Sequence, residues 1–133
     1  MTHRNVQPDG WPRPSGYSNG IVADGLQIFV AGQIGWDVNR RLVSEHFLAQ
    51  ARQALLNVVA VLDAAGAGPE HVVRMTWYVT DIVAYRSAGA SLGTIYREVM
   101  GNNYPAMSAV QVVALAEVGA VVEIEATAVV AKS

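Results

Sequence analysis

The sequence contains no cysteine and is poor in charged residues. Charged residues make up 15% of the 133 positions, with 9 lysines and arginines against 11 aspartates and glutamates and a formal net charge of -2. Without cysteine the chain cannot form a disulfide, a zinc ribbon, an iron–sulfur cluster or a thiolate nucleophile. The slightly negative charge argues against nucleic acid as a partner, because phosphate contacts require clustered lysine and arginine.

A leader sequence and long hydrophobic runs are missing as well. Residues 1–10 are polar and lack the apolar centre of a secretory signal. The apolar runs are far shorter than the roughly 20 residues of a membrane-spanning helix. We therefore expect a cytoplasmic protein without a membrane partner.

Hydrophobic residues, in contrast, are abundant at 52% of the chain. This fraction excludes a disordered protein, which could not offset the entropy of ordering. The length predicts one domain over residues 1–133, in which residues 1–15 form an irregular lead-in rich in proline and glycine. Because so much of the chain is apolar, we also expect a homo-oligomer.

The hydrophobic periodicity predicts an α+β fold with the element order ββαβαββ. Strands are expected over residues 17–22, 26–33, 71–80, 108–115 and 121–130. The Asp24-Gly25 pair predicts that the first two strands form a hairpin. Helices are expected from an N-cap at Ser44 to the breaker at Ala64–Pro69, and from Asp81 to Met100.

Two helices of this length cover only one face of a mixed sheet. In the last strand Val122 and Ile124 share one face, whereas Glu123 and Glu125 share the other. The face without helices also carries apolar side chains such as Tyr78. A symmetric oligomer is the simplest way to bury it.

Six short motifs, taken in order and spacing, resemble one known family. They are Tyr17-Ser18, Ala31-Gly32-Gln33, Gln50/Gln53 with Leu56-Asn57, the strand from Val72 to Asp81, Pro105-Ala106-Met107-Ser108 and Val122-Glu123-Ile124-Glu125-Ala126. No single motif is specific, but the ordered set is similar to the Rid proteins, also called the YjgF or endoribonuclease L-PSP family. The resemblance covers about residues 15–130 and implies a chorismate-mutase-like fold. It also implies a homotrimer with three ligand clefts at its subunit interfaces.

The resemblance further implies an activity. Active members hydrolyse the enamine and imine intermediates released by pyridoxal-phosphate enzymes, giving 2-keto acids and ammonia. On the matching positions, Glu123 helps to position the attacking water and Tyr17 contributes to the cleft, so we take these two as catalytic candidates. The substrate-binding candidates are Ala31, Gly32, Tyr104 and Met107. We expect no cofactor.

Two departures from the family pattern affect substrate binding. Met107 occupies the position of the arginine that grips the substrate carboxylate, and Gly93 that of an asparagine three residues before Tyr96. Losing two charge-assisted hydrogen bonds, each contributing about 1.5–3 kcal/mol, weakens recognition of a 2-imino acid by about a hundredfold or more. Met107, with Trp36, Tyr104 and Trp77, instead predicts a cleft for an uncharged or aromatic ligand, and Arg74 is a candidate replacement cation.

Structural roles remain open for several of these residues. Glu123 can be an ordinary solvated strand residue, Tyr17 an aromatic that packs at the interface, and Glu125 a hydrogen-bonding partner between subunits. Gly32 serves backbone geometry and not a phosphate cradle, because no lysine follows it in the required way. The three histidines are scattered, so we predict no metal site.

Two functions of different classes follow. The first is a trimeric hydrolase of an imine, an enamine or a related small metabolite that is poorly suited to standard 2-imino acids. The second is a non-catalytic small-molecule-binding or regulatory protein that kept the fold after losing the chemistry. RNA cleavage, which one of the family's names suggests, ranks last because the sequence offers no basic groove.

Overall fold

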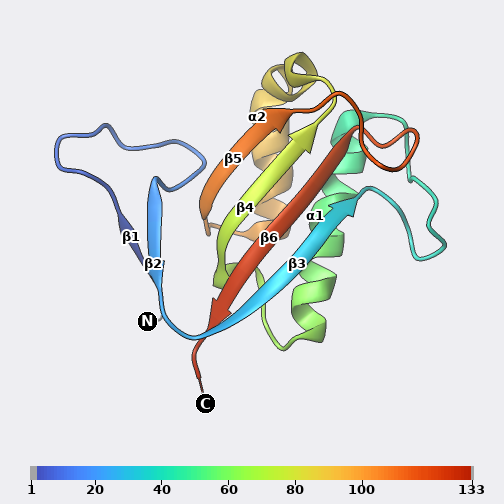
Figure 1. The fold of residues 1–133 in the computed structure, drawn as a ribbon. Helices are drawn as coiled ribbons and strands as arrows, with labels where there is room; N and C mark the ends of the chain where they lie inside the picture. Colours follow the sequence, from blue (N-terminus) through green and yellow to red (C-terminus); the bar gives the residue numbers. More distant parts are fainter. Residues whose placement is uncertain (1–2, 133) are drawn as a thin grey trace.

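The computed structural model describes residues 3–132 and contains six strands and two long helices (Figure 1). In chain order the elements are β1 (His3–Val6), β2 (Gly20–Ala23), β3 (Leu26–Ile34), α1 (Phe47–Ala64), the short 3-10 helix η1 (Pro69–His71), β4 (Val72–Val79), α2 (Ile82–Met100), β5 (Ala106–Gln111) and β6 (Val122–Val130).

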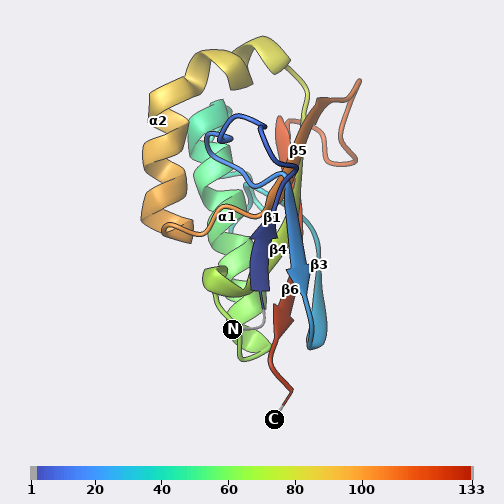
Figure 2. The same ribbon diagram turned by 90° about the vertical axis from the view of Figure 1, so that its left-hand side faces the viewer.

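A four-stranded mixed sheet forms the centre of the molecule. Its strand order is β3-β6-β4-β5, in which β4 and β5 run parallel and the other neighbours antiparallel. Both helices lie behind the sheet as seen in Figure 1, and the side view in Figure 2 shows them on one face only. The predicted α+β fold, a mixed sheet with two helices on one face, is confirmed.

The core lies between this sheet and the helices. Along α1, Ala51, Leu55, Val58 and Leu62 are fully buried at spacings of three and four residues, which is the apolar stripe of an amphipathic helix. They pack in one cluster with inward-facing strand residues such as Trp77 and Ile124. Each fully buried leucine, valine or isoleucine side chain contributes roughly 1.5–3 kcal/mol of burial free energy.

The N-terminal region differs from the prediction in two ways. Residues His3–Val6 form β1 within the segment expected to be irregular, and β1 pairs with β2 in a separate two-stranded sheet. The predicted hairpin is wrong, because β3 pairs with β6 and not with the strand before it. Gly25 has φ +147 and a Cβ there would overlap the backbone oxygen of Val130, so this glycine allows a close crossing over the end of β6.

The two helices begin in different ways. The helix α2 begins where it was predicted, and Asp81 caps it, since its carboxylate accepts hydrogen bonds from Val83 N at 2.9 Å and Ala84 N at 3.2 Å. Ser44 is not the N-cap of α1: the helix starts after His46, and the Ser44 hydroxyl accepts from His46 N in the preceding turn. Gly89, with φ 39 and ψ -116, kinks α2 near its middle.

Side-chain amides hold the loops around the sheet. Buried Gln50 donates to the carbonyl oxygens of Ser44 and Gly119 and accepts from Val121 N, all at 2.9 Å. Asn103 donates to the carbonyl oxygens of Pro69 at 2.8 Å and Val72 at 2.9 Å. The second pair of bonds fixes the loop that leads from α2 into β5.

Candidate functional site

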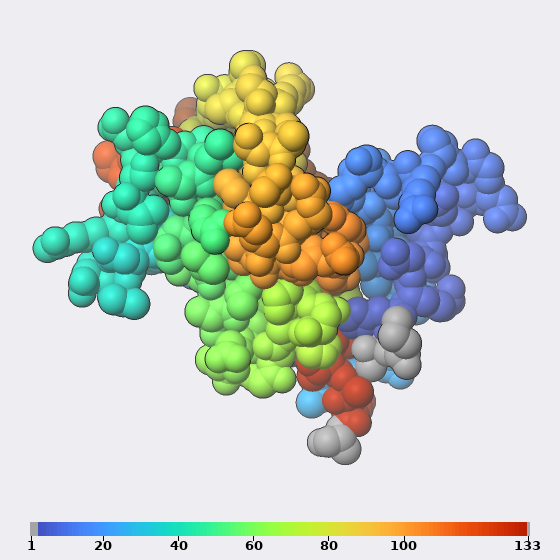
Figure 3. Space-filling view, turned by 180° about the vertical axis from the view of Figure 1, so that it is seen from behind, coloured from blue at the N-terminus to red at the C-terminus, as the bar shows by residue number. Residues whose placement is uncertain are grey.

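A cavity of about 600 Å³ lies between α2, β5 and the segment around residue 16. Seen from behind, the N-terminal segment lies beside the second half of α2 (Figure 3). The wall includes the apolar side chains of Leu92 and Met107 and five aromatic side chains, which are Tyr17, Trp77, Tyr85, Tyr96 and Tyr104.

Met107 reaches this cavity because of its register in the sheet. Parallel pairing of β4 and β5 sets Met107 beside Met75, which is 1% exposed and faces the helices. Side chains at paired positions share a face, so Met107 points to the helix side, where it packs against the core. The position predicted to lack the arginine is therefore part of a mainly apolar wall.

Tyr17 and Tyr104 are brought together by main-chain contacts. Ser18 N donates to Pro105 O at 3.0 Å, and the Ser18 hydroxyl donates to Tyr104 O. The ring of Tyr104 stacks on Tyr96, with centroids 5.5 Å apart. These contacts fix Tyr17 at the mouth of the cavity, where it is 42% exposed.

Burial makes two of the wall tyrosines harder to ionise than a free tyrosine. Desolvation raises the pKa of the Tyr96 hydroxyl far above its usual range, with a smaller contribution from Tyr104. Desolvation also raises the pKa of Tyr85. The Tyr96 hydroxyl donates to Asn103 O at 2.7 Å, so its proton holds the loop before Met107 in place. Neither hydroxyl is suited to act as a base.

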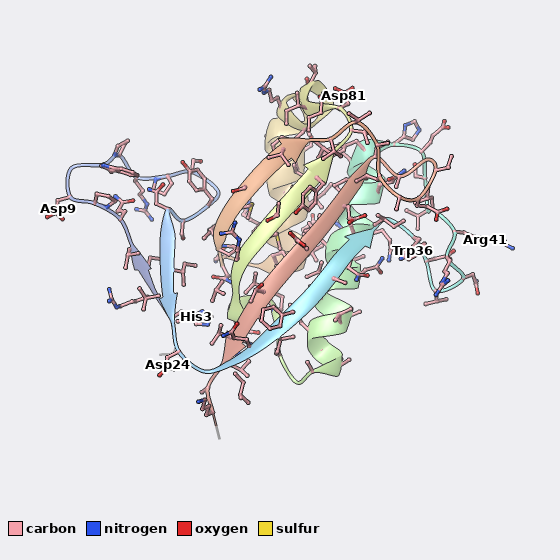
Figure 4. The ribbon with its side chains drawn as sticks, viewed as in Figure 1. His3, Asp9, Asp24, Trp36, Arg41 and Asp81 are labelled. Atoms are coloured by element: carbon pink, nitrogen blue, oxygen red, sulfur yellow. The ribbon has the colours of Figure 1, made fainter. Side chains whose placement is uncertain are left out.

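A second group of predicted site residues lies on the uncovered face of the sheet. In β6 the buried residues Val122 and Ile124 alternate with the half-buried Glu123 and Glu125, which face away from the helices. Figure 4 shows the side chains of this face with no helix or strand in front of them. Tyr78 belongs to the same face, and its hydroxyl donates to Glu125 Oε1 at 2.7 Å. That hydrogen bond is the main reason why the pKa of Tyr78 is raised, followed by burial and the two carboxylate charges.

Ala31 and Gly32 form a β-bulge beside Glu123. The register passes from Val30 opposite Ala126 to Gln33 opposite Ile124, so Ala31 and Gly32 together oppose one residue of β6. A Cβ at Gly32 would overlap the carboxylate of Glu123. The glutamate therefore lies directly against the backbone of the bulge, and only glycine leaves room for it there.

Comparison with known proteins identifies the family. The model of the family described as Endoribonuclease L-PSP matches residues 12–130. The chain belongs to this family, the Rid proteins. Human 2-iminobutanoate/2-iminopropanoate deaminase is 37% identical over 114 residues, covering 85% of this chain and 79% of the human protein. Protein DfrA of Myxococcus xanthus is 35% identical over 132 residues, 97% of each chain.

Solved structures of Rid proteins share the fold. YyfB of Yersinia pestis, a Rid-family protein of unknown function, superimposes with a TM-score of 0.84 at 35% identity over 98% of this chain and 100% of its own. Within residues 3–132 of the present Rid chain, no three His, Asp or Glu side chains lie close enough together to hold a metal ion. None of the helices in that range is long and apolar enough to cross a membrane.

Within one Rid chain, the predicted site residues form two groups on opposite faces of the sheet. Tyr17, Tyr104 and Met107 line the cavity on the helix side. Ala31, Gly32 and Glu123 lie on the uncovered side. A single chain does not bring the two groups together, and their roles in binding and catalysis remain predictions.

Two other predicted residues lie away from Met107. Trp36 follows β3 in a loop labelled in Figure 4, where the Arg40 guanidinium lies 5.7 Å from its ring centroid, and it does not line the cavity. Arg74 lines a shallow hollow on the uncovered face with Phe29 and Glu125. Arg74 is therefore not a replacement cation within the cavity of its own chain.

Sequence reasoning missed two arginines in the cavity wall. Arg86 and Arg97 line it, whereas none of its lining residues is acidic. For Arg97 the spacing in α2 was the available signal, because residues 90, 93 and 97 recur at three- and four-residue steps and so share one helix face. Arg86 lies beyond the Gly89 kink, and helical periodicity does not place it on that face.

Proposed function

We propose that this Rid protein is a homotrimeric hydrolase of imines or enamines whose active site is completed between two copies of the chain. The arrangement of Glu123 carries the proposal: its carboxylate lies over the Gly32 bulge on a sheet face that no helix covers. In a trimer, the uncovered face of one copy would meet the open side of the Met107 cavity of the next. The names of relatives such as the human deaminase support the reaction class.

Imine hydrolysis needs a positioned water and a group that moves protons. The water oxygen adds to the electrophilic carbon of the C=N bond while the Glu123 carboxylate accepts a water proton and passes it to the nitrogen. The resulting carbinolamine then transfers its hydroxyl proton to nitrogen, the C–N bond breaks, and a carbonyl compound and ammonia leave. One imine and one water are consumed, and no redox cofactor is needed.

The remaining residues would orient the substrate. Tyr17, at the mouth of the cavity, would donate its hydroxyl proton in a hydrogen bond to the substrate, while Tyr104 and Met107 would hold its apolar part. A thioether provides no charge-assisted hydrogen bond to a carboxylate. Small 2-imino acids, whose recognition depends mainly on that group, are therefore poor substrates in this proposal.

The test is a hydrolysis assay on a panel of acidic and neutral imines generated in situ, with ammonia release as the readout. We expect acceleration over spontaneous hydrolysis for imines with large side chains, and a loss of at least about a hundredfold in Glu123→Gln. Glu125→Gln is the matched control, because it makes the same charge change two residues along the same face. Unchanged turnover in Glu123→Gln, at an unchanged oligomeric mass, would refute the catalytic assignment.

A non-catalytic role is the second candidate, and Met107 in place of an arginine favours it. In that case the trimer would bind a small molecule in the same cavity and return it unchanged. A ligand bound tightly by the wild-type protein, with no turnover of any imine in the panel, would support this function and exclude the first.

A further inference from the structure

We infer that Arg97 binds the acidic group of a substrate whose aromatic body fills the cavity beneath α2. The inference rests on the proposed function only in taking this cavity as the substrate-binding part of the site. It names a specificity residue on α2 in place of the absent arginine at position 107.

The part of α2 that lines the cavity has an arginine near each end. Between Arg86 and Arg97 lie Leu92 and three small residues, Gly89, Ala90 and Gly93. The small residues leave room for a ligand beside Leu92. Because Gly89 kinks α2 between them, the two arginines belong to different helical segments.

Arg97 lies at the Met107 end of the cavity. The helix α2 ends at Met100, and the short loop after it leads directly to Tyr104 and β5. Tyr96, one residue before Arg97, stacks on Tyr104. Arg86 belongs to the other end, because its neighbour Tyr85 packs against Trp77, with ring centroids 6.0 Å apart. Arg97 is therefore the cation nearer the position at which the family arginine is missing.

Gly93 allows the guanidinium of Arg97 to fold back along the helix. A Cβ at Gly93 would lie 3.3 Å from Arg97 Nη1, closer than most such contacts. Arg97 Nη2 is 3.5 Å from the Thr94 hydroxyl, a weak contact that leaves most of its donors free. The two departures from the family pattern thus complement each other. Gly93 makes room for the Arg97 guanidinium, and Met107 stands where the family pattern has an arginine.

The charge of Arg97 is not neutralised by a carboxylate. In the part of the chain that the structure describes, the ion pairs are Arg52 with Glu98 and His71 with Glu70, and neither includes Arg97. None of the residues lining the cavity is acidic. An anion entering the cavity therefore meets positive charge without competition.

The walls favour a flat, apolar body for that anion. Tyr17, Tyr104 and Trp77 supply aromatic surface, and the volume of about 600 Å³ lies in the usual range of small-molecule sites. Trp77 is 2% exposed, and its indole Nε1–H has no hydrogen-bond partner among residues 3–132. Trp77 therefore offers the cavity ring surface and no accessible hydrogen-bond donor. The ligand class is thus a carboxylate with an aromatic body, and phenylpyruvate is a suitable probe.

Binding of phenylpyruvate tests the inference without requiring turnover. Isothermal titration calorimetry compares it with its methyl ester, which has the same ring without the charge, and with pyruvate, which has the charge without the ring. We expect phenylpyruvate to bind at least about tenfold more tightly than either. Its affinity should fall as sodium chloride is raised from 50 to 500 mM, while that of the ester should not.

Variants locate the cation. Arg97→Met should weaken phenylpyruvate binding at least about tenfold and leave the ester unchanged, and Arg97→Lys should lie between. Arg52→Met, whose side chain pairs with Glu98 outside the cavity, is the matched control and should bind like wild type. Equal affinity for acid and ester, or a loss in Arg86→Met instead of Arg97→Met, would overturn the assignment.

The result also separates this inference from the proposed function. Arg97-dependent binding of phenylpyruvate without hydrolysis of any imine would leave the inference standing and refute the hydrolase. Hydrolysis of aromatic acids and neutral imines that depends on Glu123 but does not change in Arg97→Met would support the hydrolase and refute the inference about Arg97.

Discussion

At the scale of single residues, charge and space shape the two groups of candidate site residues. Met107 and Gly32 show the two effects. Met107 adds a thioether to a cavity wall that includes five aromatic side chains, and Gly32 leaves room for a carboxylate that any side chain would displace. Each can be changed by one substitution. In the proposed function the two changes act on different steps, because the first alters substrate binding and the second moves the Glu123 carboxylate.

Replacing Met107 with arginine should convert the specificity. The guanidinium can donate two hydrogen bonds to a carboxylate, so kcat/KM for a small 2-imino acid should rise by about a hundredfold, while neutral imines gain nothing. Met107→Leu keeps the wall apolar and serves as the control. Steady-state kinetics on both substrate types measure the effect, and equal gains for acid and neutral imines would contradict the assignment of position 107.

Adding a methyl group at Gly32 should impair turnover through Glu123. The new Cβ would overlap the carboxylate and push it from the bulge, so we expect Gly32→Ala to lower kcat at least about tenfold with little change in KM. A double-mutant cycle with Glu123→Gln separates this from a general loss of structure. If both substitutions act on the Glu123 carboxylate, Gly32→Ala has no further effect on kcat in the Glu123→Gln background. Losses of kcat that multiply in the double mutant would show that Gly32 acts in another way.

At the scale of elements, the end of α2 and the loop into β5 form a unit that positions the cavity wall. The Tyr96 hydroxyl donates to Asn103 O, and the Asn103 side chain in turn donates to the carbonyl oxygens of Pro69 and Val72. One buried phenol thus ties a helix to the loop that carries Tyr104 and Met107. Since the proton on this phenol is part of the link, the stability of the unit depends on pH.

High pH should destabilise the fold through Tyr96. Its pKa is raised by burial in the folded state, so between the unfolded value of about 10 and the higher folded value only the unfolded chain loses the proton. As the pH rises above 10, the ionisation of this group in the unfolded chain lowers the free energy of unfolding by about 1.4 kcal/mol per pH unit. Urea unfolding from pH 9 to 12 measures the slope, which should be shallower in Tyr96→Phe. Parallel slopes in the two proteins would show that Tyr96 ionises freely in the folded state.

At the scale of the whole molecule, the sequence was most informative where the pattern is local. The alternation of Val122, Glu123 and Ile124 predicted both the last strand and its two faces, and Asp81 predicted the start of α2. Long-range pairing was not predictable in the same way. The Asp24-Gly25 pair predicts a hairpin turn, but in the structure Gly25 allows a crossing over Val130, which is distant in the sequence.

The arrangement of the candidate site depended on the same long-range information. Only the parallel register of β5 on β4 shows that Met107 faces the helices, on the side opposite Glu123. The sequence motifs identify Met107 and Glu123 as candidates. A motif in one strand does not, however, predict on which face of the sheet a neighbouring strand places its side chains. If the two groups act in one site, as proposed, the functional unit must contain more than one chain, and this requirement can be tested directly.

Light scattering after size-exclusion chromatography should give a mass three times that of one chain for the wild-type protein. Introducing a charge at Phe29 should abolish trimer formation. Phe29 is 73% exposed on the uncovered face, so Phe29→Asp removes little buried surface from the single chain but places a charge where the trimer would be dry. Val83→Asp, 63% exposed at the start of α2, is the control and should remain trimeric. If Glu123 and the Met107 cavity act together only across copies, Phe29→Asp should also lose imine hydrolysis while keeping a folded circular dichroism spectrum. A wild-type protein that hydrolyses imines as a monomer would refute the shared site.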